Sequence, residues 1–207
     1  MKTRESGMPD ESLWSSFFDA KAVLARIMPA SVQGDAVEFG CGYGTFTLPA
    51  ARRTSGVLHA LDIDPGMVEM TAAKTQREGL RNVRIVLHDF AAAGTGLPSA
   101  SAGYAMLFNI LHAEQPDALL HEAYRVLGAD GVLGIMHWNY DPSTPRGPSM
   151  EIRPRPEQCR DWAISAGFEL IEPGIVQLPP YHYGMMLKKP FSLVPECQLL
   201  QPGCCSE

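Results

Sequence analysis

The sequence predicts a doubly wound α/β fold with a seven-stranded, mostly parallel sheet whose last strand is antiparallel. Five short apolar runs alternate along the 207 residues with segments of helical periodicity. Apolar strands separated by helices are typical of a parallel sheet that is covered on both faces. Two further strand-like runs are separated only by a short stretch containing "PPY", which suits a hairpin better than a crossover. The order of the elements therefore predicts one domain.

The helices are predicted from apolar residues that recur at helical spacing and from the residues that flank them. Such a stripe runs from Leu13 to Met28, after the acidic start "PDES" and before Pro29, and it predicts an N-terminal helix over about 10–28. Further helices are expected over 44–54, 65–78, 115–127 and 157–166.

The strands are predicted from short runs rich in Val, Ile, Leu and aromatic residues. They are expected over 36–39, 57–62, 83–89, 104–109, 132–138, 168–178 and 182–188. The segment from Asn139 to Pro156 is rich in Pro, Gly and Ser, which predicts a long loop of the kind that is usually functional or disordered. We interpret its "RPRP", and the "ARR" at Ala51, as solvated surface.

Composition limits the classes of function. The net charge is −6 and no cluster of Lys and Arg stands out, which argues against nucleic acid as the main partner. No apolar run approaches the roughly 20 residues that span a bilayer, and the N-terminus lacks the apolar core of a secretory signal. We therefore expect a cytoplasmic protein whose five cysteines are thiols.

The domain is expected to cover 1–190, followed by a poorly ordered tail over 191–207. The tail contains Cys197, Cys204 and Cys205, but no fourth ligand stands at zinc spacing, so we expect no metal site.

The stretch "AVEFGCGYG" places Gly40, Gly42 and Gly44 directly after the first strand. In a doubly wound sheet, ligands bind beyond the carboxyl ends of the strands, where glycines let them approach the backbone. The third glycine of a dinucleotide fingerprint is replaced by Thr45 or Thr47, which argues against a nicotinamide cofactor. No Lys follows the glycines until Lys74, so a phosphate loop of the Walker type is excluded.

Three carboxylates indicate what the glycine loop binds. Asp62 closes the second strand about 20 residues after the glycines, where it can accept both hydroxyls of a ribose without core neighbours of its own. Asp89 closes the third strand, where it can accept a hydrogen bond from an exocyclic amine beside the apolar Phe90. Glu38 lies inside the first strand, where burial without a partner is costly, and this favours a cationic ligand nearby. Together these residues predict a site for a positively charged nucleoside.

Five segments now resemble the class I S-adenosylmethionine-dependent methyltransferases over about 36–188: "VEFGCGYG", "ALDIDPGMVEMTAAK", "LHDF", "LFNILHAEQP" and "EAYRVLGADGVLGI". The resemblance implies a Rossmann-like fold and S-adenosyl-L-methionine as cofactor. It implies that the glycines line the methionine part, that the second strand end binds the ribose, that Asp89 and Phe90 contact adenine and that the backbone at Asn109 holds the amino group. The cofactor-binding residues under this resemblance are Glu38, Gly40, Cys41, Gly42, Gly44, Asp62, Ile63, Asp89, Phe90 and Asn109.

The methyl acceptor is expected to be a small molecule bound at the rim beyond the fourth strand. His112 follows that strand in "FNILHAEQ", where it can bind the acceptor or remove its proton. We expect the N-terminal helix and the loop 139–156 to cover the pocket. The substrate contacts are expected from Trp14, Phe18, Tyr43, Trp138 and Tyr140. Two alternatives remain at this point: a nicotinamide-dependent oxidoreductase, and a regulatory protein that binds the cofactor without turnover.

Overall fold

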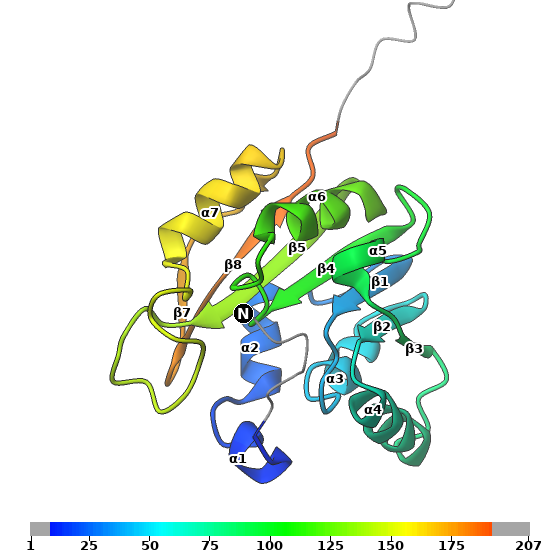
Figure 1. Ribbon diagram of the computed structural model, residues 1–207. Helices are drawn as coiled ribbons and strands as arrows, with labels where there is room; N and C mark the ends of the chain where they lie inside the picture. The colour runs from blue at the N-terminus through cyan, green and yellow to red at the C-terminus, as the bar shows by residue number, and fades with distance from the viewer. Residues whose placement is uncertain (1–8, 192–207) are drawn as a thin grey trace, which may run out of the picture.

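The computed structural model describes residues 9–191 (Figure 1). Its helices are α1 Glu11–Ser15, α2 Ala20–Ile27, α3 Thr47–Ala51, α4 Pro65–Arg77, α5 Phe90–Ala93, α6 Pro116–Val126 and α7 Pro156–Ser165. Its strands are β1 Asp35–Phe39, β2 Leu58–Asp62, β3 Val83–Leu87, β4 Ala102–Phe108, β5 Leu127–Trp138, β6 Glu169–Leu170, β7 Val176–Leu178 and β8 His182–Lys188. Between residues 9 and 191, no helix has the length and apolar character needed to cross a bilayer.

The strands form one sheet in the order β3-β2-β1-β4-β5-β8-β6, with β7 also paired to β8. The first five strands are parallel, and β8 is antiparallel to β5, which confirms the predicted fold class. The sheet has eight strands instead of the expected seven because the predicted strand over 168–178 is two short strands. Pro173, which has no N–H to donate, and Gly174, at φ +85°, turn the chain between them.

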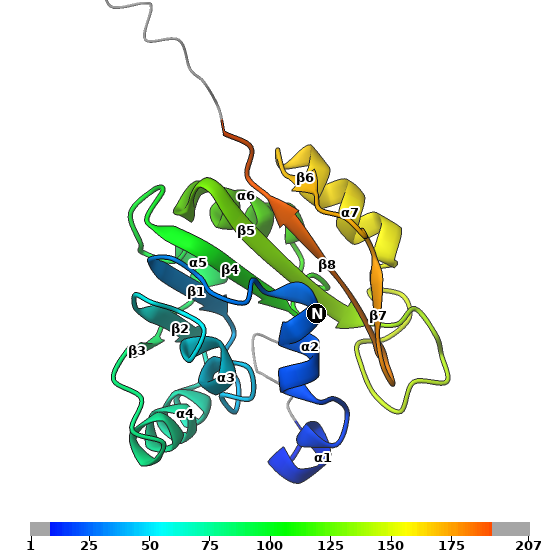
Figure 2. The ribbon, with the colours of Figure 1, turned by 180° about the vertical axis from the view of Figure 1, so that it is seen from behind.

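Helices cover both faces of the sheet, as the two opposite views show (Figures 1 and 2). One face packs a cluster that includes Leu120, Leu133 and Tyr183 against α6 and α7. The other packs a second cluster that includes Leu24 and Tyr104 against α2 and α3. Full burial of a leucine side chain contributes roughly 2 kcal/mol, so these two layers supply most of the stabilisation.

The predicted N-terminal helix over 10–28 is two helices. Asp19 accepts hydrogen bonds from the backbone of Lys21 and Ala22, and so caps the start of α2. The break before it lets the consecutive Phe17 and Phe18 both become buried, which a continuous helix would place on different faces. Tertiary burial therefore overrides the helical periodicity at this point.

Three other boundaries differ from the sequence predictions. The helix expected over 44–54 is confined to α3, because the glycine loop extends to Phe46 and Pro49 is tolerated only in the first turn. The third strand ends at Leu87, so Asp89 lies beyond it. The strand expected from Val132 begins already at Leu127 and pairs irregularly with β4 up to Tyr104.

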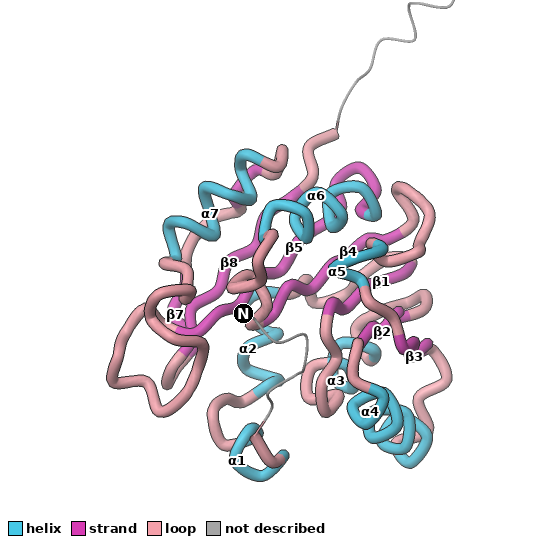
Figure 3. Tube along the Cα trace, in the orientation of Figure 1, coloured by secondary structure: helices cyan, strands magenta, loops and turns pink. Residues whose placement is uncertain are grey.

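The loop between β5 and α7 extends beyond the strand ends (Figure 3), and it is built around one buried arginine. Arg153 is 7% exposed, and its guanidinium donates to the carbonyl oxygens of Asn139, Asp141 and Pro148 and to the hydroxyl of Thr144. The interpretation of "RPRP" as solvated surface is therefore wrong for Arg153, because loop carbonyls replace the water around its charge.

The predicted tail and its three cysteines lie outside the described residues, apart from Phe191. Within residues 9–191 no three His, Cys, Asp or Glu side chains are grouped so that they could hold a metal ion.

Replacement of Arg153 by Met is expected to loosen the loop over 139–155. The lost hydrogen bonds from a charged donor predict a decrease of about 2 kcal/mol in the free energy of unfolding. Chemical denaturation measures that change, and limited proteolysis should show faster cleavage within the loop. Arg81→Met, at an exposed position, is the control. Equal cleavage of the two variants would contradict this account of the loop.

Candidate active site

The crevice for a ligand is set by the strand order. From β1 the chain adds β2 and β3 on one side of this strand, and β4 then pairs with β1 on its other side. The loops after β1 and β4 therefore start from neighbouring strand ends and lead to opposite sides. Such a reversal opens a crevice at the carboxyl ends of the strands. The loop from Gly40 to Gly44 follows β1 at this place.

The backbone of the glycine loop has left-handed conformations at Gly40, Gly42 and Gly44, with φ of +83°, +50° and +74°. A Cβ at Gly44 would also lie 3.0 Å from side-chain atoms of Leu48 and Thr71, which leaves no room for a larger residue. The Thr71 hydroxyl donates to the carbonyl oxygen of Gly42 over 2.7 Å. The loop is therefore fixed before any ligand binds.

Asp62, at the end of β2, binds the backbone of the same loop. Its carboxylate accepts hydrogen bonds from the backbone N–H of Gly42 over 2.8 Å and of Asp64 over 3.0 Å, and the residue is 5% exposed. The expectation that Asp62 has no core neighbours is thus wrong, because the carboxylate links the ends of β1 and β2. Each carboxylate oxygen keeps a second lone pair, so ribose hydroxyls fit the remaining acceptor positions.

Glu38 is a second buried carboxylate beneath the loop. It is 3% exposed, and its Oε2 accepts a hydrogen bond of 2.5 Å from the Thr47 hydroxyl. The pKa of Glu38 is raised to about 8, mainly by burial and to a smaller extent by the charge of Asp62, against the lowering effect of the hydrogen bond from Thr47. No side chain of residues 9–191 forms an ion pair with it. A bound cation would favour its ionised form.

Cys41 lies between these carboxylates and is buried. Burial, and then the charges of Glu38 and Asp62, raise the pKa of its thiol well above the usual value. The thiol therefore stays protonated and is unsuited to nucleophilic chemistry.

On the opposite wall, Asp89 caps α5 by accepting a hydrogen bond of 3.1 Å from the backbone of Ala92. Phe90 is 8% exposed and packs edge-on against Phe39, with the ring centroids 5.6 Å apart. Ile63 is half-buried after β2. The predicted adenine contacts Asp89 and Phe90 thus follow β3, and Phe90 reaches the glycine loop, because a Cβ at Gly40 would lie 3.9 Å from its ring.

Asn109 directly follows β4 with a left-handed backbone at φ +55°, and its N–H donates to the carbonyl oxygen of Met136 over 2.7 Å. Its side-chain Oδ1 is buried without a hydrogen-bond partner among the described residues. A buried acceptor of this kind is costly unless a ligand supplies a donor. An ammonium group, as in the methionine part of S-adenosylmethionine, fits it.

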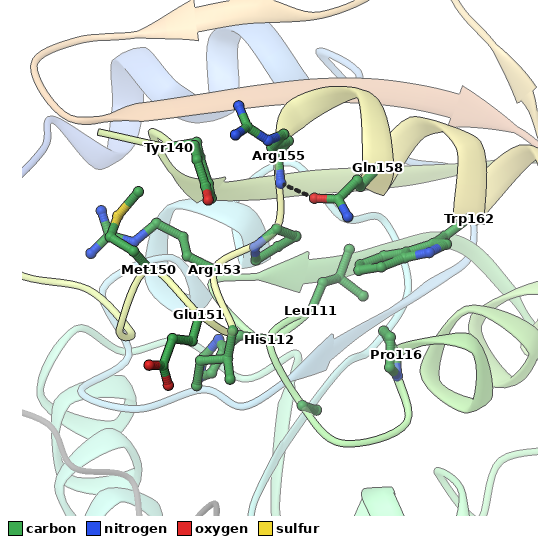
Figure 4. A pocket seen from close by; sticks show the side chains of 13 residues that line it. Leu111, His112, Pro116, Tyr140, Met150, Glu151, Arg153, Arg155, Gln158 and Trp162 are labelled. Carbon is green, nitrogen blue, oxygen red and sulfur yellow. Dashed lines mark hydrogen bonds between the residues drawn. The ribbon is translucent and has the colours of Figure 1, made fainter. Parts of the chain in front are cut away.

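A cavity of about 390 Å³ lies beyond β4 and β5, on the side of α7 (Figure 4). Residues that follow β4, the loop over 139–155 and the first turns of α7 form its walls. It is lined by Leu111, His112, Ala113, Pro116, Tyr140, Met150, Glu151, Ile152, Arg153, Pro154, Arg155, Gln158 and Trp162. Two residues predicted from the sequence, His112 and Tyr140, thus meet in one cavity.

The other predicted substrate residues lie elsewhere. Trp14, Phe18 and Trp138 pack into the second core cluster around His182, whose ring centroid is 5.3 Å from that of Phe18 and 4.3 Å from that of Trp138. The Tyr43 hydroxyl instead donates to the carbonyl oxygen of Pro9 over 2.7 Å. These side chains do not line the cavity, because the N-terminal segment packs on the opposite face of the sheet.

The N-terminal segment is attached at both ends of the crevice. Near the glycine loop, Lys74 forms an ion pair with Glu11 and donates to the carbonyl oxygen of Tyr43 over 2.6 Å. At the far end, Phe17 packs against Trp138 with the ring centroids 5.2 Å apart. Residues 9–19 therefore cover the crevice rather than the cavity.

His112 has a partner that the sequence analysis missed. Its Nδ1 lies 3.3 Å from Nε2 of His137, which is fully buried in β5. Burial, and then the nearby His112, lower the pKa of His137 well below its usual range, so His137 is neutral. A neutral imidazole that accepts a hydrogen bond from Nδ1 of His112 leaves Nε2 of His112 able to accept a proton. The one sequence signal for this partner was a histidine near the carboxyl end of the predicted strand "VLGIMHW", at the edge of the sheet where ligands bind.

The sequence analysis also did not predict that Arg155, Gln158 and Trp162 line the cavity. In the sequence, only the charged "RPRP" just before a predicted helix pointed to a site here. That this segment lies beside His112 depends on the fold of the whole loop.

The fold and the site together define a Rossmann-like α/β domain with a preformed glycine loop at the carboxyl ends of its strands. Residues 36–131 match the model of the methyltransferase domain family. This match covers 96 of the 207 residues, and it agrees with the resemblance to the class I S-adenosylmethionine-dependent methyltransferases that the motifs implied.

Three relatives illustrate the extent of the similarity. Aklanonic acid methyltransferase DauC of Streptomyces sp. (strain C5) is 36% identical over 78 residues, which are 36% of this chain and about a third (34%) of DauC. A SAM-dependent methyltransferase from Aquifex aeolicus superimposes with a TM-score of 0.73 at 20% identity, over 87% of this chain and 94% of its own. The [4+2]-cyclase SpnF superimposes with a TM-score of 0.69 at 18% identity, over 84% and 80% of the two chains.

Replacement of Asp62 by Ala is expected to lower both cofactor affinity and stability. The lost charge-assisted hydrogen bonds predict about 1.5–3 kcal/mol in the binding of S-adenosylhomocysteine, measured by calorimetry. Denaturation should show a lower free energy of unfolding as well, because the Gly42 amide loses its buried acceptor. Asp35→Ala, which removes a carboxylate that accepts a hydrogen bond from the backbone of Val57 at the opposite ends of β1 and β2, should lower stability alone. Unchanged affinity in Asp62→Ala would remove this residue from the cofactor site.

Binding of S-adenosylmethionine at pH 7 is expected to release a proton from Glu38. A cationic ligand favours the ionised carboxylate, so affinity should rise with pH and level off above about 8, where Glu38 is already ionised in the free protein. Calorimetry in buffers of different ionisation enthalpy measures the protons released. In Glu38→Gln this contribution should be absent, and equal proton release by both proteins would refute the assignment.

Proposed function

We propose that this protein transfers the methyl group of S-adenosylmethionine to a small organic acceptor bound in the cavity beside His112. One observation carries the proposal: the glycine loop and the cavity follow two neighbouring strands of the sheet. The glycine loop follows β1 and lies over two buried carboxylates, and the residues after β4 line the cavity. The first half suits a cationic nucleoside, and the second half suits an acceptor.

The residues of the crevice would hold the cofactor, with Asp62 at the ribose, Asn109 at the amino group and Phe90 at the adenine. When bound, S-adenosylmethionine supplies a methyl group that is already activated, so the protein needs no covalent nucleophile. What the chain adds is alignment of the acceptor with the methyl group and exclusion of water from the site.

His112 is the residue we propose to remove a proton from a hydroxyl or amine acceptor. The proton moves to Nε2 of His112, while Nδ1 keeps its hydrogen bond to His137. His137 then acts as a positioning residue, because it fixes the tautomer and the orientation of the His112 ring. An acceptor that is already ionised would not need this step.

The cavity and the charge of the protein favour a small molecule over nucleic acid. Its volume of about 390 Å³ is within the range of small-molecule sites. The net charge of −6 offers no attraction for a phosphate backbone. DauC, by its name, methylates aklanonic acid, which agrees with this proposal.

The fold alone does not decide the reaction, since the [4+2]-cyclase SpnF has the same fold. Incubation with labelled S-adenosylmethionine and a panel of phenols, amines, thiols and metalloid oxyanions tests for turnover directly. Transfer of label to one class supports the proposal. Binding of S-adenosylhomocysteine without transfer to any member would favour a binding or regulatory protein, and no binding at millimolar ligand would refute the proposal altogether.

Replacement of His112 by Gln is expected to lower turnover by about 100-fold or more on a hydroxyl or amine acceptor, as loss of a general base does. Affinity for S-adenosylhomocysteine should stay within about threefold, because the base acts after cofactor binding. His137→Gln should lower turnover less and shift its pH profile. His121→Gln, on the exposed face of α6, is the control. Full activity of His112→Gln would remove this residue from the mechanism.

A further inference from the structure

We propose that the cavity beside His112 selects acceptors that carry an anionic group on a flat apolar body, and that Arg155 binds the anionic group. This inference rests on the proposed function and adds the chemical class of the acceptor to it.

The first observation is the state of the Arg155 guanidinium. It lies over the ring of Tyr140, with its central carbon 3.8 Å from the ring centroid. Stacking fixes the plane of the guanidinium and leaves its N–H edge available. Other arginines, such as Arg52, Arg125 and Arg160, pair with a carboxylate, but in the described part of the chain no ion pair includes Arg155.

The second observation is a buried cation in the same wall. Among residues 9–191, all the hydrogen-bond acceptors of the Arg153 guanidinium are neutral oxygens. The negative charge of Asp141 acts on Arg153 without a hydrogen bond between the two side chains, because this carboxylate accepts from the backbone and hydroxyl of Ser143. The charge of Arg153 acts on its surroundings: the pKa of His182 is lowered to about 3, first by burial and then by this charge. The cavity wall is therefore positive in a chain whose net charge is −6.

One carboxylate, that of Glu151, lines the cavity. Its side chain is exposed, and Figure 4 shows it directed away from Arg155 and Tyr140. It therefore leaves the Arg155 side of the cavity without a competing negative charge.

The remaining walls are apolar. Trp162 of α7 faces Leu111 and Pro116, and Ile152 and Met150 come from the long loop. An indole ring opposite aliphatic side chains suits a flat, apolar ligand. In Figure 4, Arg155 and His112 lie on opposite sides of the cavity, so an acid held by Arg155 can present a different atom to His112.

The test uses three ligands of one shape and different charge: 2-naphthoate, 2-naphthamide and 2-(aminomethyl)naphthalene. Calorimetry with the full chain, with and without S-adenosylhomocysteine, measures their affinities. We expect wild-type protein to bind naphthoate about fivefold or more tightly than naphthamide, as one charge-assisted contact predicts. In Arg155→Met the two affinities should fall within about twofold, and in Arg155→Glu the amine should become the preferred ligand.

Arg160→Met is the matched control, because Arg160 lies on the same helix, pairs with Asp161 and does not line the cavity. It should keep the wild-type preference. If wild-type protein shows no preference for naphthoate, including no binding of either ligand at millimolar concentration, the inference is wrong. Retention of the preference in Arg155→Met would also overturn it. Failure of S-adenosylhomocysteine to bind would refute the proposed function instead, while the comparison of naphthoate with naphthamide still tests the cavity.

Discussion

The rest of the site depends on the hydrogen bond between the buried carboxylate of Asp62 and the backbone of Gly42. It joins the ends of β1 and β2 and fixes a loop whose three glycines all have positive φ. Without it, a loop of this composition would lose order at the place where a ligand needs a preformed surface. Glu38 lies beneath the same loop with only a neutral hydroxyl as partner, so the chain retains two carboxylates in a buried space that a cation can stabilise.

The fold was predictable because its signals are local. Apolar runs, helical stripes and the short "PPY" connection each depend on a few neighbouring residues, and they gave the parallel strands and the antiparallel β8 correctly. Errors arose where tertiary contacts decide. Phe17 and Phe18 break the N-terminal helix because both become buried, and Pro173 with Gly174 divides a predicted strand. The burial of both phenylalanines cannot be seen within their own segment, whereas the Pro-Gly pair is a local turn signal that the sequence analysis missed.

The two halves of the site differ in the same way. The cofactor half follows from a motif, since the glycines and Asp62 occupy fixed offsets from strand ends. The acceptor half does not, because His112, Tyr140 and Arg155 come together only through the loop that Arg153 organises. A buried arginine surrounded by carbonyl oxygens looks like an ordinary surface charge in the sequence. His137 was overlooked for a similar reason, since a histidine in an apolar strand gains its meaning from the residue opposite.

The N-terminal segment is attached unequally at its two ends. At the glycine loop it is held by the ion pair of Glu11 with Lys74 and by the hydrogen bond from Tyr43 to Pro9, and water can replace such contacts at small cost. At the paired ends of β5 and β8 it is held by Phe17 and Phe18, whose separation from Trp138 and His182 would expose buried aromatic rings. The contacts near the glycine loop are therefore the less costly ones to break, and their loss would uncover Tyr43 while the aromatic contacts keep the other end in place. Such an opening would lie apart from the cavity beside His112, which has its own opening to solvent on the side of α7.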